Sequence, residues 1–220
     1  RTHLYRKGNT AFPIIAVREA DVCGIPARII RMSFSGELCY EISVQANHGL
    51  QLWESLMSIG EPESIIPYAL EAANILRIEK GHFIIGFDAD GRTSASDIGL
   101  EKIMSRTKHF VGKPALDLPG MKSEERMQYV GLVINDPSVK EFPMGAILSE
   151  HGQGNPFLGR VTSACWSYEL NKPIALGLLK NGRSRIGDSL DALSPMTQKS
   201  ATVYVTDPHF YDKENTKSHG

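Results

Sequence analysis

From residue 127 onward, the chain consists of short apolar runs separated by glycine, proline, asparagine and aspartate. Five of these runs have the length of β-strands: residues 129–134, 145–148, 158–166, 173–179 and 201–205. Short strands at regular spacing, with turn residues between them, are typical of small barrels and sandwiches. The pattern predicts a small all-β barrel over residues 123–220.

The preceding part of the chain mixes strand and helix patterns. Strand-length runs are expected at residues 13–17, 24–34 and 38–44, followed by two amphipathic helices. The first helix is expected from the N-cap Asn47 to Gly60, and the second from Pro67 to a C-terminal cap at Gly81. One stripe of the first helix is apolar, with Leu50, Trp53, Leu56 and Met57. We therefore expect an α+β fold, with an α+β domain at 1–122 and a β-barrel at 123–220.

Charge and cysteine content exclude several classes of function. The net charge is −1, from 24 basic and 25 acidic residues, so the chain lacks the positive charge of a nucleic-acid-binding protein. No apolar run approaches the length of a membrane span. The three cysteines, Cys23, Cys39 and Cys165, lack metal-site or redox spacing, which favours reduced thiols in a cytoplasmic protein. Residues 1–9 are polar rather than a signal peptide, and the missing initiator Met favours a piece of a longer protein.

Most familiar catalytic patterns are absent. Asp88 and Asp90 flank one residue before Gly91, which is more typical of a turn than of a metal site, and we expect no bound metal. Ser94 and Ser96 resemble helix caps rather than nucleophiles. The glycines at 152–154 lie between two strands and predict a hairpin turn.

Residues 34–43 combine two glutamates with a strand pattern. Leu38, Tyr40 and Ile42 alternate with polar residues, so Glu41 is expected in mid-strand on the face opposite the aliphatic side chains. Glu37 lies at the turn. A solvent-facing position is the ordinary interpretation of Glu41, and a ligand contact is the alternative.

Three ordered blocks of sequence resemble the folate-dependent aminomethyltransferase family, the relatives of the glycine-cleavage T-protein. Residues 31–42 are similar to the family's Arg-x-Ser/Gly-Tyr/Phe-Thr-Gly-Glu-x-Gly-Tyr-Glu-Ile pattern, residues 76–81 to its Leu-Arg-Leu-Glu-x-Gly, and residues 110–116 to its Phe-Ile-Gly-Lys/Arg-x-Ala-Leu. Four further segments resemble the C-terminal part of the alpha subunits of heterotetrameric sarcosine oxidases: residues 11–19, 24–29, 84–91 and 205–212.

The resemblance implies an aminomethyltransferase-like folate-binding domain, without its N-terminal half, followed by the barrel. It implies that tetrahydrofolate takes up the one-carbon unit of oxidised sarcosine as 5,10-methylenetetrahydrofolate. FAD, FMN and NAD are expected only in segments or partner subunits absent here, the partners being the beta, gamma and delta subunits. The fragment alone is expected to be inactive. The alternatives are a glycine-cleavage aminomethyltransferase, a dimethylglycine-dehydrogenase-like protein, or a non-catalytic scaffold of the same fold.

The resemblance also names residues of the folate site. Glu41 matches the glutamate that binds the pterin ring, and a carboxylate suits the paired donors of that ring. Phe34 and His82 stand where the family usually has tyrosine, and Arg77 matches its Leu-Arg-Leu-Glu block, although a charge pair with Glu79 at the helix end explains that match equally well.

Two departures from the family pattern bear on the site. Ala73 replaces an arginine that contacts folate or its tail, a task that Lys80 or a barrel residue could take over. The family's catalytic aspartate belongs to the N-terminal half, so no catalytic residue is assigned in this chain.

Overall fold

The computed structural model describes residues 12–219 apart from 124, 141, 143–144 and 153–155. Residues 1–9 and most of the predicted hairpin turn at 152–154 therefore lie outside the described residues. Contacts divide the chain into two compact units, Arg1–Leu76 with Asp212–Gly220, and Arg77–Tyr211. These units are defined by contacts within the chain, whereas the boundary predicted near residue 122 separates the α+β region from the barrel. That boundary stays a prediction.

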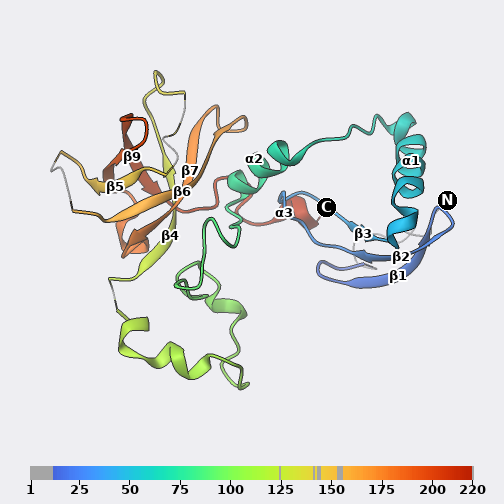
Figure 1. Ribbon diagram of the computed structural model, residues 1–220, viewed down its shortest axis with the longest axis horizontal. Coiled ribbons are helices and arrows are strands. Elements are labelled where there is room, and N and C mark those ends of the chain that lie inside the picture. Colours follow the sequence, from blue (N-terminus) through green and yellow to red (C-terminus); the bar gives the residue numbers. More distant parts are fainter. Residues whose placement is uncertain (1–11, 124, 141, 143–144, 153–155, 220) are drawn as a thin grey trace. The chain divides into compact units, whose positions relative to one another are not determined.

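The first unit contains an antiparallel sheet of three strands in the order β1-β2-β3 (Figure 1). Its strands are β1 (Val17–Val22), β2 (Ile25–Ile30) and β3 (Glu41–Ser43). Cys23 and Gly24 form the two-residue turn between β1 and β2, and both have positive φ, 56° and 80°. Such a turn matches the twist of the two strands. β1 therefore begins at Val17, the last residue of the strand predicted at 13–17, and ends at the turn of Cys23 and Gly24. Residues 13–16 are outside the sheet.

One face of this sheet packs against α1 (Gly49–Gly60). Ile25, Ala27 and Ile29 alternate along β2 and are buried in one cluster with Leu52 of α1. Ile42 of β3 is packed against the same cluster. Because side chains alternate along a strand, Glu41 and Ser43 lie on the other, solvent-exposed face, as the sequence predicts for Glu41.

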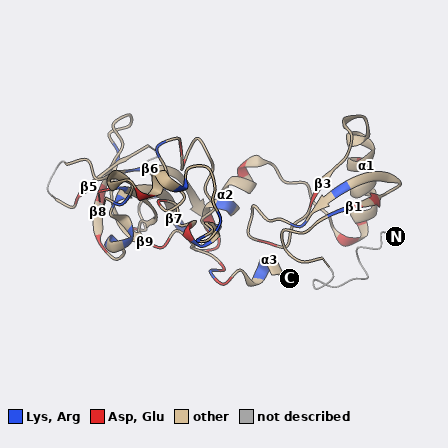
Figure 2. Cartoon of the chain, turned by 90° about the horizontal axis from the view of Figure 1, so that it is seen from below, with Lys and Arg blue, Asp and Glu red and all other residues tan. Residues whose placement is uncertain are grey.

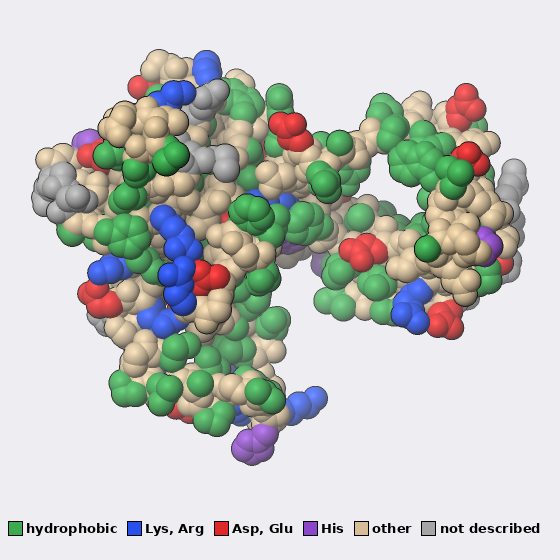
Figure 3. Space-filling view, in the orientation of Figure 1, with side chains coloured by type: hydrophobic (Ala, Val, Ile, Leu, Met, Phe, Trp, Pro, Cys, Tyr) green, Lys and Arg blue, Asp and Glu red, His purple; other side chains and the backbone are tan. Residues whose placement is uncertain are grey.

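Helix α1 carries apolar side chains on two sides, and the predicted stripe is only partly the buried one. Leu50 and Trp53 are 70% and 54% exposed, whereas Leu52 is buried and Leu56 packs beside it. Hydrophobic atoms accordingly reach the surface over this helix (Figure 3). The 3.6-residue period fits both stripes, so it does not reveal which stripe faces the sheet.

The second unit contains a closed antiparallel barrel in the order β4-β7-β6-β5-β8-β9, which confirms the predicted small barrel. Its strands are β4 (Met127–Val133), β5 (Ile147–Glu150), β6 (Gly159–Ser167), β7 (Lys172–Lys180), β8 (Ser189–Leu193) and β9 (Ser200–Thr206). Strand β8 is not predicted from the sequence, because its five residues include Ser189 and Asp191 and do not form an apolar run.

Apolar side chains fill the barrel and also cover part of its outside. Leu132, Leu148 and Leu190 belong to the inner cluster, in which every core member is less than a tenth exposed. A second cluster contains Tyr129 of β4 together with Ile78. Acidic and basic residues are interspersed over the barrel strands (Figure 2).

Helix α2 (Leu70–Lys80) begins three residues after Pro67, its predicted first residue. The C-terminal cap at Gly81 is confirmed. Gly81 has φ +81°, its N–H donates to the Ile78 carbonyl at 3.0 Å, and the N–H of His82 donates to the Arg77 carbonyl at 2.8 Å. This pair of bonds is a Schellman motif.

A four-residue helix, α3 (Thr216–His219), belongs to the first unit. No helix among residues 12–219, as far as they are described, is long and apolar enough to cross a membrane.

Candidate functional site

Glu41 is the first residue of β3, and its backbone is paired with Ile30 of β2. The side chain is exposed, and within the described residues no hydrogen bond or ion pair involves its carboxylate. A hollow of about 640 Å³ is lined by residues of all three strands, but Glu41 and Phe34 are not among the residues that line it. Glu41 is therefore a carboxylate on a rigid strand with all four lone-pair positions open to a ligand.

The loop before Glu41 is organised by short-range hydrogen bonds. The N–H of Gly36 donates to the Ser33 hydroxyl at 2.9 Å, and Gly36 has φ +90°, a conformation that suits glycine. The Tyr40 ring stacks on the Phe12 ring with centroids 5.8 Å apart. These contacts replace strand pairing over residues 34–40, so β3 is shorter than the predicted run at 38–44.

Phe34 lies in this loop with 44% of its surface exposed. Met32 and Leu38 of the same loop are also exposed large hydrophobic residues. A flat aromatic ring with polar edges binds to a surface of apolar side chains that also carries a polar group for its edge. The exposed side chains of this loop and the open carboxylate of Glu41 provide these two features. Phe34 therefore has the exposure that its predicted role needs.

The negative charge of Glu41 affects the pKa of a neighbouring thiol, that of Cys39. Burial raises the pKa of Cys39 above its ordinary value, the backbone N–H of Tyr40 opposes this shift, and the negative charge of Glu41 adds to it. A ligand that donates hydrogen bonds to Glu41 would therefore also change the electrostatic contribution of Glu41 to the pKa of Cys39.

Arg77 lies in the second unit and is only 3% exposed. Its guanidinium donates to Asp88 Oδ2 at 2.7 Å, to the Ser163 hydroxyl at 2.7 Å and to the His82 carbonyl at 3.1 Å. The carboxylate of Glu79, its predicted partner in a charge pair, accepts from the Ser167 hydroxyl at 2.6 Å. These contacts satisfy the buried guanidinium of Arg77, and its role in folate binding stays a prediction.

Asp88 has a role that its sequence pattern does not reveal, since that pattern indicates a turn rather than a metal site. It is fully buried and accepts hydrogen bonds from Arg77, from the Ile84 N–H at 2.9 Å, from Ser163 at 2.8 Å and from Thr162. Two of its partners lie more than 70 residues away in the sequence. No local pattern could have revealed that pairing.

His82 and Lys80 are the two other candidates of this region. His82 directly follows the glycine cap, and its side chain is half-buried. Lys80, proposed as a substitute for the arginine missing at position 73, is 1% exposed. A side chain so deeply buried makes a poor anchor for the charged tail of a surface-bound ligand.

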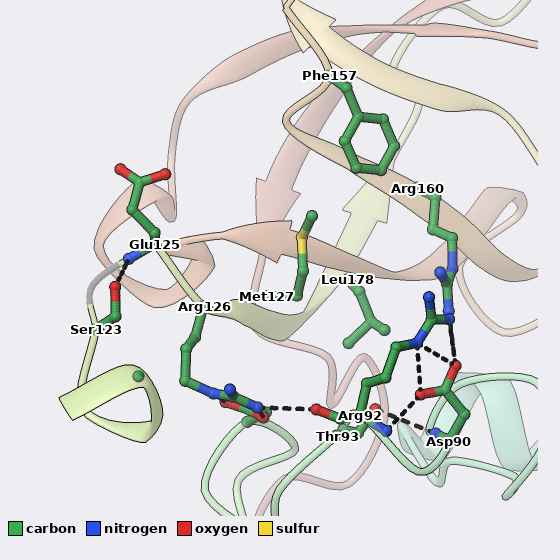
Figure 4. Close-up of a pocket in the computed structure, with 12 residues that line it drawn as sticks. Asp90, Arg92, Thr93, Ser123, Glu125, Arg126, Met127, Phe157, Arg160 and Leu178 are labelled. Atoms are coloured by element: carbon green, nitrogen blue, oxygen red, sulfur yellow. Dashed lines mark hydrogen bonds and ion pairs between the residues drawn. The ribbon is translucent and has the colours of Figure 1, made fainter. Parts of the chain in front are cut away.

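A cavity of about 490 Å³ opens in the second unit, with three arginines in its wall (Figure 4). Arg92 and Arg160 both point toward the carboxylate of Asp90, at 2.5 and 3.8 Å. Hydrogen bonds from the Arg92 side chain and backbone hold the pKa of the Asp90 carboxyl well below its usual range. The local charges thus largely balance each other.

The third arginine of this cavity is also paired. Arg126 binds Asp97 and donates to the Arg92 carbonyl at 2.9 Å. Burial raises the pKa of Asp97, but the hydrogen bonds from Arg126 and Ser94 outweigh burial and lower it. Ser94 and Asp97 also bond each other's backbone N–H groups, so the predicted cap at Ser94 orders a turn rather than a helix. Since each arginine already faces a carboxylate, we assign this cavity no ligand.

The predicted site residues fall into both units. Glu41 and Phe34 belong to the first, whereas Arg77 and His82 belong to the second. Within the described residues, no group of three or more His, Cys, Asp or Glu side chains is arranged to hold a metal ion. Burial raises the pKa of Cys165 to about 12, so this thiol is not a nucleophile at neutral pH.

Comparison with known families matches both parts of the chain. Residues 4–108 match the GCVT N-terminal domain, and residues 128–212 match the glycine cleavage T-protein C-terminal barrel domain. The second match coincides with the closed barrel of β4–β9. The first match includes Glu41 and its loop.

Among curated proteins, the chain is 36% identical over 217 residues to the sarcosine oxidase subunit alpha of Corynebacterium sp. (strain U-96), an alignment that covers 96% of this chain and 22% of that subunit. It is 26% identical over 193 residues to the aminomethyltransferase of Thermotoga sp. (strain RQ2), covering 88% and 51%. The chain thus spans about half of that aminomethyltransferase and about a fifth of the sarcosine oxidase subunit.

Among solved structures, the chain resembles the glycine cleavage system aminomethyltransferase T from Bartonella henselae. The TM-score is 0.75 at 22% identity, over 90% of this chain and 52% of that one. At this level of identity the likeness shows the fold. It agrees with the expected α+β region followed by a barrel.

Proposed function

Because the chain belongs to the glycine cleavage T-protein family, we propose that it binds tetrahydrofolate at Glu41 and serves transfer of a one-carbon unit. We propose further that the whole protein is a sarcosine oxidase alpha-type subunit, in which the one-carbon unit of oxidised sarcosine is captured as 5,10-methylenetetrahydrofolate. The identity of 36% over 96% of the chain supports this finer assignment.

The observation that carries the proposal is the placement of Glu41. Its carboxylate is exposed, is mounted at the start of a strand, and binds no side chain or backbone group among the described residues. A pterin ring presents an amino group and a ring N–H side by side, and a carboxylate can accept both in short charge-assisted hydrogen bonds. Phe34 supplies apolar surface in the same loop.

The residues of this chain contribute binding and orientation. Glu41 fixes the pterin edge, and Phe34 covers part of the ring and excludes water from it. Bound tetrahydrofolate supplies the nucleophilic nitrogen that takes up the one-carbon unit. Correct orientation and exclusion of water favour capture over hydrolysis to formaldehyde. The carboxylate of Glu41 also provides a negative field for a cationic imine.

We propose that other parts of the whole protein carry out the oxidation. FAD, FMN and NAD, and the beta, gamma and delta subunits, belong to this proposal through the similarity to sarcosine oxidase subunit alpha.

The proposal predicts a change in how the one-carbon unit is partitioned. In the full-length protein with sarcosine and tetrahydrofolate, Glu41→Gln is expected to lower the ratio of methylenetetrahydrofolate to formaldehyde by about tenfold or more, the effect of losing a charge-assisted hydrogen bond. The rate of sarcosine oxidation should be unchanged, because the oxidation takes place elsewhere. Both products can be measured by chromatography of quenched reactions.

Glu37→Gln is the matched control, since Glu37 lies four residues earlier in the same loop and is expected to serve only the turn. An unchanged product ratio in Glu41→Gln would contradict the site. Failure of the wild-type protein to oxidise sarcosine, combined with folate binding that depends on Glu41, would favour an aminomethyltransferase instead.

A further inference from the structure

We propose that Arg31 and the segment 212–219 together position the folate loop, defined as residues 33–40, and with it Glu41. This inference rests on the proposed function, because it concerns how the binding residue is held in place. Arg31 acts through the backbone and is a positioning residue rather than a ligand contact.

The first step of the argument is the environment of the Arg31 guanidinium. Arg31 is 2% exposed. It donates to the Phe12 carbonyl at 2.7 Å, to the Ser218 carbonyl at 3.1 Å and to the His219 carbonyl at 2.7 Å. A buried guanidinium needs acceptors for its donors, and two of these three acceptors lie 187 and 188 residues away in the sequence.

The second step is where Arg31 lies relative to the folate loop. Arg31 directly follows Ile30, the residue paired with Glu41. The same Phe12 that accepts from Arg31 stacks its ring on Tyr40, the residue before Glu41. Both ends of the loop are therefore held at Phe12.

The third step concerns the order of segment 212–219 itself. The Asp212 carboxylate accepts from the N–H groups of Thr216 and Lys217 at 2.9 and 3.1 Å and so fixes the start of α3. Ser218 is buried. The last carbonyls of a helix have no acceptor role within the helix, so they are available to Arg31. The segment thus brings two fixed acceptors to the base of the folate loop.

Taken together, these contacts form a clamp of three parts: Phe12, Arg31 and the carbonyls of Ser218 and His219. Removing either Arg31 or the segment leaves buried polar groups without partners. We expect the folate loop to open locally when this happens, because a loop with few buried contacts of its own depends on its anchors.

The test compares the 220-residue chain with Arg31→Met, Arg31→Lys and a form that ends at residue 211. Hydrogen exchange of the amides at 33–41 and alkylation of Cys39, which lies in the loop, are measured without ligand. Arg31→Met and the shortened form are expected to speed both by about tenfold or more, since local opening controls both. Exchange in β4–β9 should not change.

Binding of 5-formyltetrahydrofolate is the second readout. We expect Arg31→Met and the shortened form to weaken it by about fivefold or more, and Arg31→Lys, which keeps the charge and some of the hydrogen bonds, to recover part of the loss. Lys122→Met is the control, because Lys122 lies in the second unit and forms an exposed ion pair with Asp117 at 2.9 Å.

Wild-type exchange at 33–41 in both Arg31→Met and the shortened form would overturn the inference. If the loop opens as expected while Glu41→Gln leaves folate affinity unchanged, the clamp stands and the proposed function fails. If Glu41→Gln weakens binding but opening of the loop does not, the clamp has no role in binding and the inference is wrong.

Discussion

Replacement of Arg77 by methionine is expected to lower the free energy of unfolding of the second unit by about 3–5 kcal/mol, the usual cost of breaking a buried ion pair from one side. Arg77 and Asp88 are 3% and 0% exposed, and their nearest charged atoms are 2.7 Å apart. Methionine fills similar space but donates no hydrogen bond. The Asp88 carboxylate would remain buried with only hydroxyl and backbone donors.

Chemical denaturation monitored by tryptophan fluorescence measures this effect. The chain has two tryptophans, one in each unit, so a Trp53→Phe background leaves Trp166 of β6 as the reporter of the barrel. Lys122→Met is the control, since the exposed Lys122–Asp117 pair lies in the same unit as Trp166 and should be worth about 0.5 kcal/mol or less. A loss below about 1 kcal/mol for Arg77→Met would mean that the pair is not a main anchor of α2.

Replacement of Gly81 by alanine is expected to cost about 2–5 kcal/mol, from two separate causes. Gly81 has φ +81°, a region that costs an alanine about 1–2 kcal/mol. A Cβ at this position would also overlap the carbonyl oxygen of Pro208 and lie 2.8 Å from its carbon. Because the obstacle is backbone rather than the end of a side chain, relief requires a shift of the chain, at about 1–3 kcal/mol.

Two other glycines separate these causes. Gly86 has φ +98° but open space around a Cβ, so Gly86→Ala should show only the conformational cost. Gly91 has neither feature, and Gly91→Ala should be close to neutral. Thermal or chemical denaturation of the three variants gives the ranking. Equal stability of Gly81→Ala and Gly86→Ala would show that the approach of Pro208 is easily relieved.

The barrel was the most predictable part of the fold. Its strands are apolar runs bounded by turn residues, and five of the six could be placed from these features. β8 was not predicted, because side chains alternate along Ser189–Leu193 and only Leu190 and Ala192 are buried apolar residues. Register and closure depend on pairings between distant strands, such as β4 with β9, which no local pattern encodes.

The first unit was harder to predict, for two physical reasons. The loop at 33–40 has the alternation of a strand, yet hydroxyl–backbone bonds at Ser33 and Ser35 and the positive φ of Gly36 bend it out of the sheet. Helix α1 is apolar on two sides, so its burial depends on the sheet beneath it rather than on its own period. In the loop, local hydroxyl–backbone bonds override the strand alternation, whereas in α1 the tertiary contact with the sheet decides which stripe is buried.

The candidate site was predictable in part. The exposed position of Glu41 follows from strand alternation, whereas its proposed role in folate binding rests on the family resemblance. The partners of Arg77 and Arg31 were not predictable, because Ser163, Ser218 and His219 approach from distant parts of the chain. Arg77, a residue of the family motif, is thus buried and paired with Asp88, and its role in folate binding stays a prediction.

The central claim is that Glu41 holds the pterin ring, and calorimetric titration of 5-formyltetrahydrofolate tests it most directly. The account predicts that the 220-residue chain binds this ligand and that Glu41→Gln loses about 1.5–3 kcal/mol of binding free energy, the value of a hydrogen bond to a charged group. Glu37→Gln should bind like the wild type. Equal affinity of the wild type and Glu41→Gln, or no binding to either chain, would contradict the account.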